Sequence, residues 1–424
     1  MRPWLLPLLV GACGDNLAPS GSFEIVGHSD LGARGMNSAL AIAGDTAYVG
    51  SRIDGKGIAI VDIHDPANPT VVGEIGAPDE GLTGMSSREL RVVPDLHLLV
   101  VMNLACSPDL HGCQSGQAER ENLKLFDISN PRAPVLAATY SFTTSFRSAR
   151  DPHEFYVWNH LAFVSVPGAG SQLEVVNLET AAQVGSWDPG LGASGNGILH
   201  SVSISPDGKT AYLSHQTAGL WLADVSDPAM PHMITTQGLD WAPPGMGPHS
   251  AVKAPGRDLL VVTEEIYPMP YGAGCPWGHL RTVDIRDPMA PVVVGEFALP
   301  EQDPARCASY PALTAFTAHN ATVTHDLALV TWYAGGLQAI DVSDPTAPAQ
   351  LAELRPDPIA SVAKEDPGLS GNHVEMWSYP VVDSGLIYVV DVRNGLYVLR
   401  YHGRWAEQFS QLAFAEGNSN RDVR

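Results

Sequence analysis

The chain has 424 residues, with 24 Lys and Arg against 46 Asp and Glu and a formal net charge of −22. A negative field of this size repels phosphate backbones, so nucleic acid is excluded as an expected partner. No apolar run reaches the roughly 18 residues that a membrane-spanning helix needs. A chain of this length exceeds one ordinary compact core, and a barrel or a repeat array is expected to organise it.

Residues 1–13 have the features of an export signal: a positive start, a short apolar stretch over 4–10, and small residues before Cys13. The run VGAC at 10–13 resembles a lipobox, in which the cysteine is lipidated after cleavage. An ordinary signal peptide or a misassigned start codon is the alternative. We expect an exported lipoprotein anchored to the envelope through Cys13, with a flexible tether at 14–21. Gly14 favours the outer membrane or cell surface.

Four further cysteines point to disulfides, because an even number in an exported chain is typical of a bridged framework. They are Cys106, Cys113, Cys275 and Cys307. Cys106–Cys113 and Cys275–Cys307 are favoured among the three possible pairings, since each closes one local loop. No CxxC motif occurs, so a thiolate zinc site is not expected.

One phrase recurs along the chain: an alternating apolar strand, an Asp, then x-Asp-Pro-x-x-Pro and another strand. Its copies are GIAIVDIHDPANPTVVGEI, LKLFDISNPRAPVLAATY, GLWLADVSDPAMPHMITT, LRTVDIRDPMAPVVVGEF and GLQAIDVSDPTAPAQLAEL, with degenerate copies LEVVNLETAAQVGSW and GLYVLRYHG. Period-2 alternation predicts strands, and Asp-Pro ends a strand because proline has no ladder donor. Seven copies spaced roughly 47 to 65 residues apart predict one four-stranded propeller blade each.

The ends of the array predict how the ring closes. The last copy stops after its third strand, and the segment SFEIVGHSD at 22–30 reads as an orphan fourth strand. Pairing the two would remove the exposed edges. The fold is therefore expected to be all-β, a seven-bladed β-propeller over residues 22–402 whose N-terminal strand closes the last blade. Residues 403–424 are expected to lie outside it, as a short helix and a tail.

The phrase resembles the LVIVD repeat, found in bacterial surface and exported propellers. The resemblance covers most of residues 22–402 and implies the architecture, while it implies little about activity.

Histidines recur at one point of the repeat, the start of each blade's first strand. The starts DPHE, ILHS, GPHS, TAHN and GNHV contain His153, His200, His249, His319 and His373, and Glu89 is aligned to the same place in the second blade. First strands line the central channel, so these side chains should converge on the axis. A structural reading, in which they only plug the channel, stays open.

The functional interpretation of this ring is a metal site. Neutral imidazole suits Cu, Fe, Zn and Ni, whereas Ca²⁺ and Mg²⁺ prefer oxygen ligands. Glu154 and Glu375 are candidate acceptors that could fix the imidazole tautomers, and packed or solvated carboxylates are the alternative. The same face of the propeller is expected to bear the long insertions and all four body cysteines. Rim candidates at the ends of second strands are His215, Glu264, Glu265, Tyr267, Trp332 and Tyr333.

The ring is also similar to that of other propellers with channel histidines: the selenium-binding protein and methanethiol oxidase family, thought to use copper, and the iron-dependent carotenoid oxygenases. The repeat style favours the former and hence copper, with iron or zinc possible, although that family's cysteine motif is missing. No GxSxG, P-loop, HExxH or dinucleotide motif occurs. Three functions follow: an oxidase or oxygenase of a small molecule, a non-catalytic surface propeller that binds protein or glycan, and a metal-binding lipoprotein without turnover. A monomer is expected.

Overall fold

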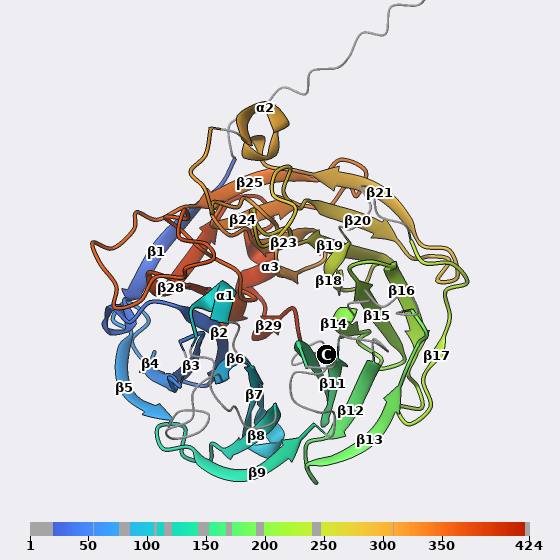
Figure 1. The fold of residues 1–424 in the computed structure, drawn as a ribbon, viewed down its shortest axis with the longest axis horizontal. Helices are drawn as coiled ribbons and strands as arrows, with labels where there is room; N and C mark the ends of the chain where they lie inside the picture. Colours follow the sequence, from blue (N-terminus) through green and yellow to red (C-terminus); the bar gives the residue numbers. More distant parts are fainter. Residues whose placement is uncertain are drawn as a thin grey trace, which may run out of the picture.

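The computed structural model of the chain describes residues 20–53, 55–75, 85–105, 108–113, 121–142, 152–166, 172–191, 199–239, 247–307 and 309–419. Seven antiparallel sheets stand around a central axis as the blades of a propeller (Figure 1). The all-β, seven-bladed fold predicted from the repeat is thereby confirmed. Cys13, residues 14–19 of the expected tether and Cys106 lie outside the described residues.

Six blades have the same order of four strands, from the axis outward. Blades one to three comprise β2 (Asn37–Ala43), β3 (Thr46–Ser51), β4 (Ile58–Asp62) and β5 (Thr70–Ile75); β6 (Met85–Val93), β7 (Leu98–Ala105), β8 (Asn122–Asp127) and β9 (Val135–Ser141); and β10 (Glu154–Trp158), β11 (Leu161–Val166), β12 (Gln172–Asn177) and β13 (Ala182–Trp187). Blades four to six comprise β14 (Leu199–Ile204), β15 (Thr210–His215), β16 (Gly219–Asp224) and β17 (His232–Met233); β18 (Pro248–Lys253), β19 (Leu259–Glu264), β20 (Leu280–Asp284) and β21 (Val292–Phe297); and β22 (Ala321–Val323), β23 (Leu327–Thr331), β24 (Leu337–Asp341) and β25 (Ala349–Leu354).

The seventh blade is built from both ends of the chain. Its sheet has the order β1 (Ser22–Ser29), β28 (Gly395–His402), β27 (Leu386–Asp391), β26 (Val381–Asp383) and β29 (Phe414–Glu416). β1 pairs antiparallel with β28, so the blue and red segments lie side by side in Figure 1. This pairing confirms that the N-terminal strand closes the ring.

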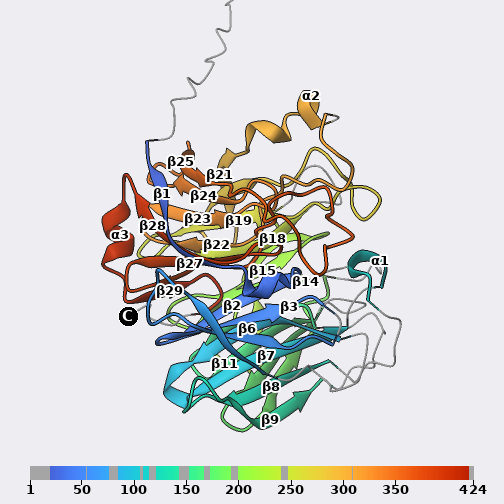
Figure 2. The same cartoon turned by 90° about the vertical axis from the view of Figure 1, so that its left-hand side faces the viewer.

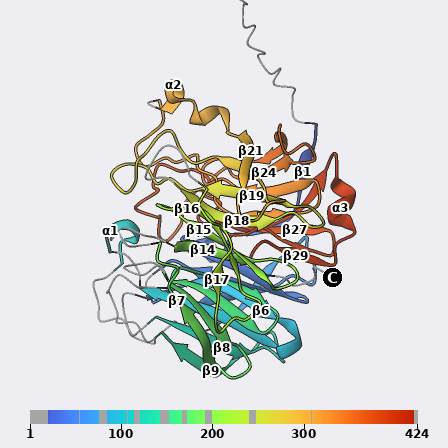
Figure 3. The same cartoon turned by 90° about the vertical axis from the view of Figure 1, so that its right-hand side faces the viewer.

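The helices are short and lie outside the sheets. They are α1 (Pro108–His111), α2 (Pro304–Cys307) and α3 (Ala406–Ser410), with 3-10 turns η1 (Leu31–Ala33), η2 (Pro94–Leu96) and η3 (Pro300–Gln302). Within the described part of the chain, none of the helices has the length and apolar character of a membrane span. α1 and α3 lie on opposite faces of the disc (Figures 2 and 3).

The repeated Asp of the phrase ends the third strand of a blade by capping its turn. The Asp62 carboxylate accepts the backbone N–H of His64 at 3.0 Å, and Asp224 accepts that of Ser226 at 2.8 Å. A carboxylate that accepts the N–H two residues on imitates a backbone turn. The repeat is therefore visible in the sequence because each blade needs the same local turn chemistry.

The hydrophobic core is divided into layers between neighbouring blades. One cluster joins Val100 and Leu125 of the second blade to Phe155 and Val164 of the third, all with at most 1% of their surface exposed. Since each blade buries its faces only against its neighbours, the seven sheets are stable as a closed ring.

The C-terminal segment belongs to the propeller, which corrects the expectation that residues 403–424 lie outside it. β29 adds an inner strand to the last blade by pairing with β26. Phe409 of α3 and Phe414 of β29 are 2% and 3% exposed. Their burial explains why this segment docks on the sheet, since an aromatic side chain gains about 1.5–3 kcal/mol when it leaves water.

The same segment then crosses toward the third blade. The backbone N–H of Val157 donates to the carbonyl of Asn418 at 3.1 Å. Next to it, a Cβ at Gly417 would lie 1.9 Å from the carbonyl oxygen of Ala321, so only glycine permits this close approach. The C-terminal segment thus spans one end of the channel, on the face that also bears α3 (Figures 1 and 2).

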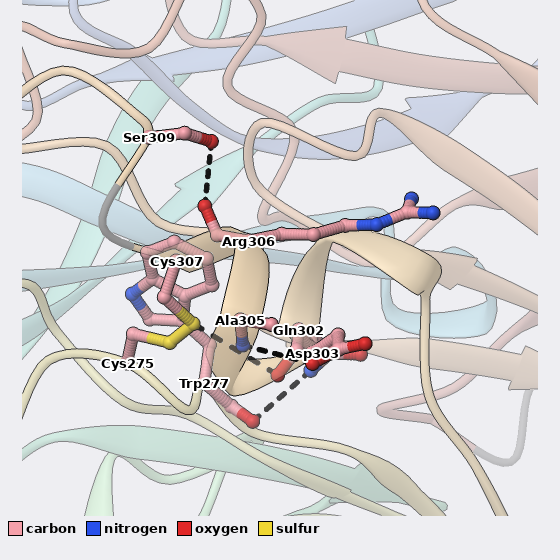
Figure 4. Close-up of a disulfide and its surroundings, with 8 residues drawn as sticks. All are labelled: Cys275, Trp277, Gln302, Asp303, Ala305, Arg306, Cys307 and Ser309. Atoms are coloured by element: carbon pink, nitrogen blue, oxygen red, sulfur yellow. Dashed lines mark hydrogen bonds between the residues drawn. A yellow bond between two sulfur atoms is a disulfide. The ribbon is translucent and has the colours of Figure 1, made fainter.

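One predicted disulfide lies in the described residues. Cys275 and Cys307 are bonded, with Cα atoms 5.8 Å apart (Figure 4). The bridge ties the loop after β19 to α2, and Gln302 supports it by donating from Nε2 to the carbonyl of Trp277 at 3.0 Å. It therefore braces a long connection within the fifth blade against the connection from the fifth blade to the sixth.

Candidate metal centre

Four histidines form a continuous row at one end of the channel. His153 lies one residue before the inner strand β10, His319 lies two residues before β22, and His200 and His249 lie within β14 and β18. The ring centroids are 4.0 Å apart for His153–His200, 4.0 Å for His200–His249 and 3.9 Å for His249–His319. Residues far apart in sequence are thus brought into contact because they occupy one position in successive blades.

Hydroxyl groups of the preceding blade donate to the backbone carbonyls of His200, His249 and His319. Ser165 Oγ of blade three donates to the carbonyl of His200 at 2.7 Å, and Ser250 Oγ of blade five donates to that of His319 at 3.0 Å. In β14 and β18 the register shifts at the histidine itself, which is a β-bulge. A bulge re-aims a side chain, and here it directs the imidazole into the channel.

In the second blade a β-bulge shows that Glu89 was wrongly aligned to the histidines. β6 shifts register between Ser87 and Glu89, so Arg88 occupies the position of the histidines. Ser38 Oγ donates to the Arg88 carbonyl at 3.0 Å, as the serines of blades three and five do to their histidines. Glu89 instead forms a buried ion pair with Arg91, whose guanidinium nitrogens are 3.2 Å away.

In the seventh blade the position belongs to Trp377, and His373 is exposed. The carbonyl of Trp377 accepts from Thr331 Oγ1 at 3.1 Å, the same contact that the hydroxyls of other blades make. It also accepts from His319 Nδ1 at 2.5 Å. The expectation that His373 faces the other four histidines is therefore wrong, because the segment before β26 does not follow the repeat.

Several nitrogens of the row are buried without a hydrogen-bond partner. Among the described residues, none satisfies Nδ1 of His153, His200 or His249, nor Nε2 of His249. Burial lowers the pKa of His153 to about 4 and lowers the pKa of His200 and His249 well below the usual value. These imidazoles are therefore neutral at pH 7, which is the form that binds metal ions.

Glu265 provides a carboxylate at the centre of the row. Its Oε1 lies 3.2 Å from His319 Nε2, and its Oε2 lies 3.6 Å from His249 Nε2 and 3.7 Å from His200 Nε2. Burial alone would raise its pKa, but His319 and the hydroxyl of Tyr333 outweigh burial and hold the pKa well below its usual range. Glu265 is therefore an anion that faces three imidazoles.

Two groups of three side chains could hold a metal ion. They are His249, Glu265 and His319, and Glu154, His200 and His249, with all ligand atoms of a group within 4.8 Å of one another. Ligands about 2.0–2.1 Å from a tetrahedral metal stand roughly 3.3–3.4 Å apart. The spacing of Glu265 from its imidazoles matches that value without a change of backbone.

Three histidines of the row, His153, His249 and His319, line a cavity of about 110 Å³. Its walls are Arg52, Arg88, Glu89, Leu110, His111, His153, Glu154, His249, Glu265, Tyr267, His319, Tyr333 and Trp377. Pockets for drug-sized ligands run to roughly 300–1,000 Å³, so this one suits a small molecule.

A buried ionic network closes one wall of the cavity. Arg52 Nη1 lies 3.2 Å from Asp366 Oδ2 and 3.3 Å from Glu375 Oε1. Its Nη2 lies 3.0 Å from His111 Nε2 and 3.4 Å from Tyr267 Oη. Burial and the nearby Arg52 lower the pKa of His111 to about 3, so the network has one fixed cation and a neutral imidazole.

Comparison with known families agrees with this architecture. The family model of the LVIVD repeat matches residues 34–76, 118–142, 197–236 and 318–352. The chain contains LVIVD repeats and folds as a seven-bladed β-propeller. The search of curated proteins found no match. The LVIVD repeat indicates the fold and not the activity, so the chemistry has to be argued from the residues of the site.

The remaining predicted side chains of the LVIVD-repeat propeller lie in different places. Glu154 faces the row and can act as a ligand. Glu375 contacts Arg52 rather than an imidazole. His215 accepts the N–H of Ala218 at 2.9 Å within its own turn.

Two other rim candidates are structural in their contacts. Glu264 pairs with Arg281 at 3.2 Å, and Trp332 is fully buried and donates to the carbonyl of Phe316 at 3.1 Å. Tyr267 and Tyr333 line the cavity, as does Glu265.

Sequence reasoning missed five residues of the cavity, which are Arg52, Arg88, Leu110, His111 and Trp377. Arg52 directly follows β3, the same place after a second strand that holds Glu265 after β19, so this rule could have identified it. Arg88 is next to Glu89, but no sequence signal reveals the bulge that exchanges them.

Proposed function

We propose that the histidine row binds one transition-metal ion, with His249, His319 and Glu265 as principal ligands and His200 beside them. The observation that carries the proposal is His249, whose two ring nitrogens are both buried and unpartnered among the described residues. Buried polar atoms are normally hydrogen-bonded, so an exception calls for a missing partner. A cation between His249 and Glu265 would supply it.

The charge states favour the Glu265 group over the Glu154 group. Glu265 is ionised, whereas burial and the nearby Glu89 raise the pKa of Glu154 well above its usual value. A cation is stabilised by a carboxylate that is already charged. Glu154 then serves as a neutral group beneath the site, and gains a charge only if an ion moves toward it.

Imidazole ligands suit copper, iron and zinc, and a set of two histidines and one carboxylate is typical of non-haem iron sites. When bound, copper or iron would supply redox chemistry to a small molecule in the cavity. The chain's own contribution is positional: the Tyr333 hydroxyl donates to Glu265 and orients it, and serine hydroxyls hold the backbone carbonyls of His200 and His319. We propose an oxidase or oxygenase of a small substrate on this basis.

Elemental analysis of protein purified without added metal tests this proposal. About one ion per chain is expected, and the His200→Ala/His319→Ala double variant should lose it. His373→Ala is the matched control, since His373 is exposed and away from the row. Protein that contains no metal, and takes up none on dialysis against copper, iron and zinc, would contradict the metal site. The remaining function would then be a surface propeller that binds protein or glycan. Oxygen consumption with thiols or phenols then separates an enzyme from a metal-binding protein without turnover.

We propose further that the protein is exported and lipid-anchored. The lipobox at residues 10–13 supports this, as does the Cys275–Cys307 disulfide, because such bonds form in oxidising compartments. Cys13→Ser should move the protein from the detergent phase of a cell-envelope extract to the aqueous phase. A wild-type protein that already partitions into the aqueous phase would contradict the anchor.

A further inference from the structure

Two arginines line the cavity above the histidine row, and they differ in their partners. Arg52 is paired with Asp366 and Glu375. Arg88 makes no side-chain hydrogen bond and no ion pair with the described residues; its guanidinium carbon lies 5.9 Å from the centroid of the Trp377 ring. Burial lowers the pKa of Arg88, yet a guanidinium stays charged at every physiological pH. A partly buried cation thus lines the cavity with no carboxylate of the described residues within ion-pair distance.

A second donor on the same cavity is also unused. Trp377 is 4% exposed, and its indole Nε1 has no acceptor among the described residues. Indole nitrogen can only donate, so a buried one normally finds an acceptor. Arg88 of the second blade and Trp377 of the seventh both lie in the position that histidines occupy in blades three to six, and the first blade stands between them.

We propose that Arg88 and Trp377 recognise the anionic group of the substrate, and that this substrate is a small carboxylate. The inference rests on the proposed function, because it places the carboxylate beside the metal ion. A planar carboxylate can accept two parallel hydrogen bonds from a guanidinium, and its charge would offset that of Arg88. The cavity of about 110 Å³ limits the rest of the molecule to a short chain.

The neighbouring groups support an anion at this point rather than a cation. Arg52 lies on the same wall and stands 5.3 Å from the Trp377 ring, so two guanidinium groups flank the space. Glu265, the central carboxylate, is turned toward His319 and accepts from Tyr333. The net charge of −22 opposes anions at long range, but salt screens that field beyond roughly 8–10 Å. Selection therefore depends on contacts inside the cavity.

Titration calorimetry of the full chain with acetate, in chloride-free buffer, tests the proposal. Acetamide is the probe of equal shape and no charge. We expect acetate to bind and acetamide not to bind, with Arg88→Gln weakening acetate roughly ten- to hundredfold and Trp377→Phe weakening it less. Arg286→Gln, at an exposed arginine paired with Asp284, is the matched control and should bind as the wild type does.

Metal content measured on the same samples keeps the two proposals apart. Arg88→Gln should retain the metal and lose acetate, while metal-stripped wild type should still bind acetate. Acetate binding that survives in Arg88→Gln but disappears on stripping would mean that the metal alone holds the anion, which overturns the inference. Absence of metal with Arg88-dependent acetate binding would instead contradict the proposed function only.

Stability supplies a readout that a structural arginine would not give. Because Arg88 is partly buried and unpaired, Arg88→Gln should raise the Tm of the ligand-free protein, by about 1–2 °C for a chain of this size. Saturating acetate should raise the Tm of the wild type and leave that of the variant unchanged. A lower Tm for Arg88→Gln without ligand would show that Arg88 supports the fold, and would refute the assignment.

Discussion

Replacing His249 by leucine should cost the metal-free protein almost no stability, although the residue is fully buried. His249 is 0% exposed, and neither ring nitrogen has a hydrogen-bond partner among the described residues. An unsatisfied buried polar group costs about 1–3 kcal/mol, so its removal offsets the packing lost with the ring. We expect the unfolding free energy of His249→Leu to lie within about 1 kcal/mol of the wild type, or above it.

His319→Leu is the matched variant within the same row, and it should clearly destabilise the metal-free protein. His319 Nδ1 donates to the Trp377 carbonyl at 2.5 Å, and its Nε2 lies 3.2 Å from Glu265. Losing a hydrogen bond and a charge-assisted contact together should cost about 2–4 kcal/mol without metal. The difference between the stability effects at these two neighbouring histidines follows only from their partners.

Urea unfolding in the presence of a chelator measures the stability of each metal-free variant, and the same experiment with excess metal measures the stabilisation by the ion. Free metal at a hundred times its Kd should stabilise the wild type by about 2.7 kcal/mol, and His249→Leu by much less. His373→Leu, at an exposed position, should match the wild type in both conditions. The reasoning is refuted if His249→Leu is as destabilising as His319→Leu in chelator and gains the same stability from metal.

Three further predictions concern stability. Asp366→Asn should lower the unfolding free energy by about 3–5 kcal/mol at pH 7, because Arg52 loses its charged partner. Asp366 has a pKa of about 2, below its value in the unfolded chain, so its contribution to stability is present above about pH 3.9 and is lost as the pH falls toward 2. The difference between variant and wild type in urea unfolding should therefore shrink at pH 3. His153 has a pKa of about 4, below that of the unfolded chain, so the unfolded state binds the extra proton between pH 6.5 and 4. The unfolding free energy of the metal-free wild type should therefore fall by about 1.4 kcal/mol for each unit that the pH is lowered across that window. His153→Leu should flatten this dependence of stability on pH. An unchanged slope in the variant would contradict a buried neutral imidazole. Ending the chain after His402 removes buried Phe409 and Phe414 and should cost about 3–6 kcal/mol, visible as a lower Tm, whereas an unchanged Tm would show that this segment is a passive tail.

The fold was predictable because its signals are local and repeated. Each blade ends its third strand with the same Asp turn, seen at Asp62 and Asp224, and alternation of apolar residues marks the strands. The closing strand β1 could be anticipated since the last copy lacks a fourth strand. The C-terminal strand β29 could not, because three residues at Phe414–Glu416 show no periodicity and dock only through tertiary contacts.

The site was only partly predictable because register in a strand can shift by one residue without trace in the sequence. The aligned histidines of blades three to six do meet, since those blades follow the repeat closely. Because of a bulge, Arg88 and not Glu89 occupies the histidine position in the second blade. In the seventh blade an irregular segment places Trp377 there instead of His373. The partners of Glu265 depend on side chains from three blades, which no linear pattern reveals.

Anomalous diffraction at the absorption edge of the bound metal, on crystals of the full chain, tests the central claim most directly. One peak is expected roughly 2.0–2.2 Å from Nε2 of His249, Nε2 of His319 and a carboxylate oxygen of Glu265. A map without a peak at the histidine row in metal-saturated crystals, or with peaks only at surface carboxylates, would contradict the metal centre and leave the row as a packing feature of the channel.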